Sequence, residues 1–174
     1  DADGNSIATY NVGLMPGDFA HWTGTDENNE ALSWVFVANE GAYGSSNGSI
    51  SMINEDGDVF ETDAIGDVVQ SLEVYENKLI VLVNNSHLIK IYNITSDGLA
   101  MPGIEVSTEA SGPREMVIVD EDVYFTNRNT SDVKIFNLTT YNIDASIPVG
   151  DYPEGITTDG STIWVANSGG TTVN

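Results

Sequence analysis

A strand-like segment that ends in asparagine occurs four times in this chain, at a nearly constant interval. Each segment is a run of hydrophobic and β-branched residues, and the asparagines are Asn39, Asn84, Asn127 and Asn167. These positions lie 40 to 45 residues apart, which is the length of a four-stranded propeller blade. The interval constrains the fold more than any single motif does, because it predicts a chain of repeated blades.

Further strands are predicted on both sides of each asparagine. A turn that opens a strand precedes each hydrophobic run, and after a short polar loop a strand with alternating apolar and polar residues follows the first three runs. Residues 145–150 and 8–13 have the pattern of a fourth strand. We therefore expect blade repeats at residues 14–62, 66–107, 112–149 and 152–174, with residues 5–13 as the last strand of a preceding blade.

The expected fold class is all-β. No segment has the apolar i, i+3, i+4 pattern of a long helix, and Asp56-Gly57, Asp97-Gly98 and Asp159-Gly160 are typical of hairpin turns. Residues 1–174 are predicted to form a single partial β-propeller domain. About three and a half blades are present, whereas propellers close with roughly four to eight. We expect the ring to be completed by additional chain rather than by a second copy.

The charge and residue content exclude several classes of function. The chain has 27 acidic and five basic residues, for a formal charge of −22, which repels nucleic acid and anionic membranes. The acids are spread over turns and strand ends, which is typical of a solvated surface. Cysteine is absent, so this segment has no disulfides or thiolate metal sites. No apolar run reaches the ~18–20 residues needed to span a bilayer, and no signal peptide is present, so we expect a mature exported protein.

Several motifs resemble known propeller families. Trp164-Val165-Ala166-Asn167, preceded by residues 150–156 and an Asp-Gly turn, resembles the YVTN class of secreted β-propellers. The motifs at 39–51, 66–71, 83–86, 113–114 and 123–127, in that order, are similar to the cell-surface propellers of Bacteroidota. The best understood members of that family are lipoproteins, about seven blades around, that capture cobalamin and pass it to a TonB-dependent outer-membrane transporter, so the resemblance implies a ring of about seven blades. The resemblance implies a secreted or cell-surface, outer-membrane-associated protein with a corrinoid ligand and a transporter as partners.

One face of the predicted propeller is the expected ligand site. The loop that enters each innermost strand and the loop between the second and third strands emerge on the same face, here called the loop face. Loops on a rigid scaffold usually carry binding residues. The candidate ligand-binding residues on this face are Tyr43, Asp67, Gln70, Asn85, His87, Arg114, Arg128, Tyr152 and Glu154.

Each candidate also has a purely structural interpretation. Arg114 and Arg128 either present guanidinium groups to a carboxylate, phosphate or amide, or pair with the neighbouring acids Glu115 and Asp132. Tyr43 and Tyr152 either stack on a flat ligand or pack within their loops. A residue that recurs in every blade is expected to hold a turn by hydrogen bonds, so the four asparagines are interpreted as structural. His21 and His87 are interpreted as surface residues without metal, and Trp34, Phe125 and Trp164 as core between blades.

No catalytic signature is present. The sequence contains no Gly-x-Ser-x-Gly elbow, no phosphate-binding glycine loop and no HExxH motif. We therefore predict no catalytic residues, no metal and no cofactor. The predicted function is a non-enzymatic, secreted or cell-surface propeller that binds a small molecule, a corrinoid being the implied ligand. The alternative is a structural surface-layer, adhesive or filament-forming propeller that self-assembles through blade edges, which the absence of a lipidation cysteine favours.

Overall fold

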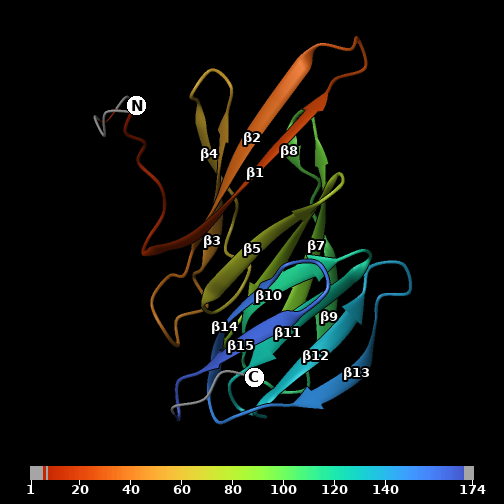
Figure 1. Ribbon diagram of the computed structural model, residues 1–174. Helices are drawn as coiled ribbons and strands as arrows, with labels where there is room; N and C mark the ends of the chain where they lie inside the picture. Colours follow the sequence, from red (N-terminus) through yellow and green to blue (C-terminus); the bar gives the residue numbers. More distant parts are fainter. Residues whose placement is uncertain (1–5, 7, 171–174) are drawn as a thin grey trace.

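The computed structural model describes residues 6 and 8–170, and these residues form an all-β chain (Figure 1). Within them lie fifteen β-strands and no helix, and therefore no helix long and apolar enough to cross a membrane. The glycines of the three predicted Asp-Gly turns, Gly57, Gly98 and Gly160, have φ angles of 84°, 99° and 88°. The predicted hairpin turns are thus confirmed, because glycine adopts positive φ without steric cost.

The strands form four sheets in chain order, here called blades 1 to 4 (Figure 1). Blade 1 contains β1 (Pro16–Thr25), β2 (Ala31–Asn39), β3 (Ser49–Asn54) and β4 (Val59–Glu61). Blade 2 contains β5 (Val69–Tyr75), β6 (Lys78–Val83), β7 (Leu88–Thr95), β8 (Gly98–Leu99) and β9 (Ile104–Ser107). Blade 3 contains β10 (Pro113–Val119), β11 (Asp122–Asn127), β12 (Asp132–Asn137) and β13 (Asn142–Pro148). Blade 4 contains β14 (Pro153–Thr158) and β15 (Ile163–Asn167).

The blades pack face to face, as in a propeller. All strand pairs are antiparallel, and the first strands contact one another from β1 to β5, β5 to β10 and β10 to β14. The packing of β6 on both of its faces explains the continuous apolar run in its sequence. Leu79, Val81 and Val83 join the core shared with blade 1, whereas Ile80 and Leu82 join the core shared with blade 3. Because successive side chains of a strand point to opposite faces, a blade with neighbours on both sides needs both sets apolar.

Two sequence predictions are wrong and one falls outside the described residues. Residues 8–13 form no strand, because no described strand pairs with them. Instead, the Gly13 N–H donates to Ser51 Oγ at 3.1 Å. Trp34 and Phe125 are core residues as predicted, but Trp164 is 40% exposed, because no described sheet covers that face of blade 4. The third strand expected from residue 171 onward lies outside the described residues.

Candidate functional site

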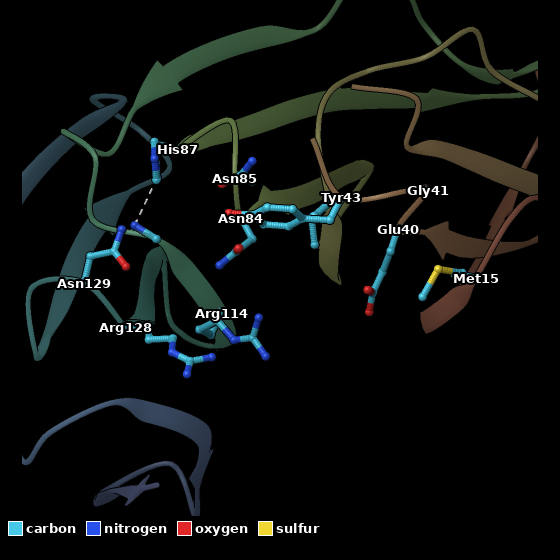
Figure 2. A pocket seen from close by; sticks show the side chains of 12 residues that line it. Met15, Glu40, Gly41, Tyr43, Asn84, Asn85, His87, Arg114, Arg128 and Asn129 are labelled. Carbon is cyan, nitrogen blue, oxygen red and sulfur yellow. Dashed lines mark hydrogen bonds between the residues drawn. The ribbon is translucent and has the colours of Figure 1, made fainter. Parts of the chain in front are cut away.

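The loop face carries a pocket of about 480 Å³ that reaches across blades 1, 2 and 3 (Figure 2). Its walls come from the two loop classes named above, which the structure brings to one face as predicted. The lining residues are Met15, Glu40, Gly41, Tyr43, Val68, Asn84, Asn85, His87, Gly112, Arg114, Arg128 and Asn129.

The residue before each innermost strand has a left-handed backbone. Met15, Val68, Gly112 and Tyr152 have φ angles of 56°, 61°, 67° and 51°, and each immediately precedes β1, β5, β10 or β14. The first three line the pocket. Non-glycine residues adopt this conformation at a steric cost, and sites that hold it are often functional. Sequence reasoning missed this repeat because only one of the four positions is glycine.

Arg114 connects three blades. This residue of β10 donates from Nε to Glu154 Oε2 of β14 and from a terminal nitrogen to Gln70 Oε1 of β5, both at 2.7 Å. Its side chain is only 24% exposed. Glu115, the neighbour considered from the sequence, is not its ion-pair partner. Arg114 therefore joins the innermost strands of blades 2, 3 and 4. Although it lines the pocket, it has a structural role.

Arg128 is held more loosely. Its terminal nitrogen lies 3.6 Å from Glu154 Oε1 and its side chain is 50% exposed, while its guanidinium carbon lies 5.3 Å from the centre of the Tyr152 ring. A cation over an aromatic face is attracted by the ring. The alternative pairing with Asp132 is not formed, and Asp132 instead accepts hydrogen bonds from Thr130 and Ser146, both at 2.6 Å. Arg128 thus keeps donors available to the pocket.

Asp67 and Asn85 connect the loops of blades 1 and 2 by hydrogen bonds. The buried Asp67 carboxylate accepts from Gly44 N at 3.0 Å and from Asn85 Nδ2 at 2.6 Å. Asn85 lines the pocket, whereas Asp67 does not. Tyr43 lies on the same loop as Gly44 and is 78% exposed, so its ring is not packed within the loop and remains available for stacking.

His87 is oriented by the backbone of the next blade. Its Nδ1 accepts a hydrogen bond from Gly112 N at 3.2 Å, and the ring lines the pocket. In the neutral imidazole the acceptor nitrogen carries no proton, so this bond assigns the proton to Nε2. His21 lies away from the pocket and hydrogen-bonds Ser33 Oγ at 2.9 Å. No three acidic or histidine side chains in the described part of the chain are arranged to hold a metal ion.

Three of the repeated asparagines donate hydrogen bonds within the protein, but of these three only Asn127 makes the predicted local bond to the backbone. Asn39 donates to Ser49 and Ser51 at 3.1 and 3.0 Å, Asn127 donates to Phe125 O at 3.0 Å, and Asn84 donates to Pro113 O in the next blade at 2.8 Å. Asn84 also lines the pocket. The position directly after the repeated asparagine indicates the pocket better than the asparagine itself, because Glu40, Asn85 and Arg128 all line the pocket from that position. Sequence reasoning missed Glu40, although the repeat could have identified it.

Of the predicted candidates, five line the pocket and four do not. The lining residues are Tyr43, Asn85, His87, Arg114 and Arg128. Gln70, Glu154 and Tyr152 are joined to them through the two arginines, and Asp67 supports the loops. The structure also brings in Met15, Glu40, Val68 and Asn129, which the sequence did not single out.

The innermost strands also carry carboxylates with altered acidity. Burial raises the pKa of Glu73 on β5, and the nearby Asp18 charge raises it further. Burial raises the pKa of Glu115 on β10 as well, with Asp18 and Glu154 adding to the effect and Ser71 and Arg114 opposing it. The charged forms of these two side chains are thus disfavoured in the folded protein.

Glu73→Gln is expected to raise the melting temperature at pH 7. Because the pKa of Glu73 is raised above 4.5 in the folded state, its charge costs stability at neutral pH, and that cost disappears as the pH falls through the folded pKa towards 4.5. Thermal melts from pH 7 to pH 4 should show that the gain in melting temperature of the variant over the wild type becomes smaller as the pH falls. The exposed Glu27→Gln is the control for removing one negative charge. An equal or lower melting temperature for Glu73→Gln at pH 7 would contradict the expectation.

The fold is similar to that of solved β-propeller structures. Streptogramin B lyase matches with a TM-score of 0.65 and 16% identity, over 89% of this chain and 54% of the lyase chain. Hydrazine synthase from Kuenenia stuttgartiensis matches with a TM-score of 0.64 and 15% identity, over 86% and 56%. The computationally designed Ika4 protein matches with a TM-score of 0.67 and 11% identity, over 98% and 96%.

These likenesses confirm the propeller fold. The chain spans about half the length of the two natural proteins, in agreement with a partial propeller. At such low identities the likeness extends to the fold alone. No family model and no curated protein matches the sequence.

Proposed function

We propose that this partial propeller is a non-enzymatic binding protein whose loop-face pocket captures a small molecule. The observation that supports the proposal is a pocket of about 480 Å³, within the range of small-molecule sites, beside a half-exposed arginine that is not hydrogen-bonded to its nearest acid. Side chains from several rigid blades converge there, which preorganises a site and lowers the entropic cost of binding.

The proposed mode of binding uses no covalent chemistry. Arg128 donates to a carboxylate, phosphate or amide carbonyl of the ligand, and the exposed rings of Tyr43 and Tyr152 offer flat apolar contact area. Arg114 lies beside them with two of its nitrogens already engaged. It acts as a positioning residue for Glu154 and, through Glu154, for Arg128.

The proposed ligand class is a corrinoid, and the proposed location is secreted or at the cell surface, next to an outer-membrane transporter. The support is the resemblance of the loop motifs to the Bacteroidota surface propellers, together with the chemistry of the pocket. A corrinoid presents a flat macrocycle edged with carboxamides, which suits aromatic rings next to both donors and acceptors.

Titration with cyanocobalamin tests this proposal. We expect a stoichiometric, coloured complex, and we expect Arg128→Gln to weaken it about ten-fold, because a charge-assisted hydrogen bond is lost. Lys78→Gln, which removes the same charge from a residue outside the pocket lining, is the matched control and should leave the affinity unchanged. Absence of binding to the wild-type chain would reject the corrinoid, and equal affinities for wild type and Arg128→Gln would reject this pocket.

A structural, self-assembling role is the second candidate, and exposed apolar side chains at both ends of the blade series favour it. Phe19 on β1 is 70% exposed, and Trp164 on β15 is 40% exposed. Their strand neighbours Ala20 and Val165 are buried, so both rings point away from the adjoining blade. Exposed apolar surface of this kind is typical of interaction sites.

Under this second function, Phe19→Glu is expected to abolish self-association. Light scattering after size exclusion should then give assemblies of the 18.6 kDa chain for the wild type and a single chain for the variant, because a charge placed in an apolar interface is costly. Met101→Glu changes another exposed, large apolar side chain, which lies in a loop, and should not alter the mass. A wild-type protein that is entirely monomeric would rule out this role.

A further inference from the structure

Opposite ends of the pocket carry opposite charges. Figure 2 shows Arg128, His87 and Asn129 at one end and Glu40 and Met15 at the other. The Glu40 carboxylate has no hydrogen bond or ion pair with any residue that the structure describes. The Arg128 guanidinium has only the loose 3.6 Å approach to Glu154. Each end therefore offers a charged group that is free to contact a ligand.

The propeller repeat produces this polarity. Glu40, Asn85 and Arg128 stand at the same position of three successive blades, directly after the repeated asparagine. The side chains at that position are negative in blade 1, neutral in blade 2 and positive in blade 3. Because the pocket reaches across these blades in that order, it has a carboxylate wall, an amide middle and a guanidinium wall.

The charges of the pocket balance locally within a strongly acidic chain. Arg114 pairs with Glu154 at 2.7 Å, which leaves Glu40 and Arg128 as opposite charges at the two ends. The whole chain has a formal charge of −22, and its field opposes the approach of a free anion. A ligand that is neutral overall avoids this repulsion, and a dipolar one meets a complementary group at each end.

We propose that the pocket takes a small dipolar molecule in one orientation. Its ammonium or amide N–H group lies on Glu40, its carboxylate or carbonyl group lies on Arg128, and its flat apolar part lies against Tyr43. This inference rests on the proposed function, because it specifies the ligand of the same pocket. It adds the polarity of the ligand, which no sequence motif indicates, and it assigns a binding role to Glu40.

Three probes with the same aromatic ring test the orientation. 4-(Aminomethyl)benzoic acid carries an ammonium and a carboxylate at opposite ends of its ring, 4-(acetamidomethyl)benzoic acid keeps only the carboxylate, and 4-(aminomethyl)benzamide keeps only the ammonium. Ligand-observed NMR on the wild-type chain should show that the zwitterion binds about five-fold tighter than either capped form, because each capped form loses one charge-assisted contact. Equal affinities for the three probes, or no binding of any probe up to about 10 mM, would overturn the inference.

Two variants assign each end of the ligand. Glu40→Gln should abolish the preference for the zwitterion over its N-acetyl form and leave the preference over the amide. Arg128→Gln should abolish the preference over the amide and leave the preference over the N-acetyl form. Both positions lie in loops outside the apolar cores, so the melting temperature should be unchanged. If either variant affects both preferences equally, the proposed orientation is wrong.

The salt dependence gives an independent readout. Binding of the neutral zwitterion should be insensitive to added NaCl, whereas the N-acetyl anion should bind more tightly as salt screens the negative chain. An anion whose binding weakens with salt would contradict the argument from net charge. Failure of the cyanocobalamin titration with a clear preference for the zwitterion would reject the corrinoid and keep the dipolar pocket. Cobalamin binding without that preference would keep the corrinoid and reject the dipolar pocket.

Discussion

Arg114→Met is expected to lower the free energy of unfolding by about 2–3 kcal/mol, the usual contribution of hydrogen bonds to a charged group. The variant loses the 2.7 Å contacts with Glu154 and Gln70, which connect the innermost strands of three blades. It also leaves the Glu154 carboxylate, only 27% exposed, with no partner closer than Arg128. For a chain of this size, the melting temperature should fall by about 5–10 °C.

Arg128→Met is the matched control, because it removes an arginine from the same cluster. Arg128 is half exposed and makes no close ion pair, and such surface pairs contribute about 0–1 kcal/mol. Chemical denaturation of both variants should therefore separate a stability role for Arg114 from a binding role for Arg128. Equal losses of stability in the two variants would contradict this division.

Leu82→Ala is expected to cost about 3–4 kcal/mol, in the middle of the range for buried leucines. Leu82 lies on β6, is fully buried and belongs to the core shared by blades 2 and 3 together with Phe125 and Phe136. Shortening it leaves a cavity between two sheets that cannot collapse without moving a whole blade. A urea titration should show a lower midpoint with an unchanged slope.

Leu14→Ala is the control for the chemistry of this substitution. Leu14 is 55% exposed and precedes β1, so its truncation should change stability by less than about 0.5 kcal/mol. A comparable loss at both positions would mean that the core between blades 2 and 3 does not control unfolding. A small effect at Leu82 alone would mean that this core relaxes around the missing side chain.

The two variants probe different levels of the same architecture. Apolar burial between blades supplies most of the stability, whereas the Arg114 cluster fixes how the loop ends of blades 2, 3 and 4 meet. Loss of Leu82 should therefore weaken folding and leave the pocket chemistry intact in the folded fraction. Loss of Arg114 should disturb both.

The blades were predictable from the sequence because their signals are local. Alternation of side chains, hydrophobic runs that end in asparagine, and Asp-Gly turns are each determined within a few residues. The same repeat shows which loops share a face, so Tyr43, Asn85, His87, Arg114 and Arg128 could be assigned to the loop face. Trp164 and residues 8–13 were misassigned because their burial or pairing depends on a neighbouring sheet that the described chain does not provide.

The sequence by itself determined the blade period, the strands and the face on which the loops meet. Only the tertiary structure decided which polar groups on that face are engaged and which are free. Arg114 reaches Glu154 and Gln70 across 40 and 44 residues of chain, whereas neither arginine pairs with the nearby acid, Glu115 or Asp132, that was one of its two possible partners from the sequence. Such partners depend on how adjacent blades are spaced and rotated by their apolar cores. No local pattern encodes that geometry, so the free carboxylate of Glu40 and the available donors of Arg128 became visible only when the blades were packed.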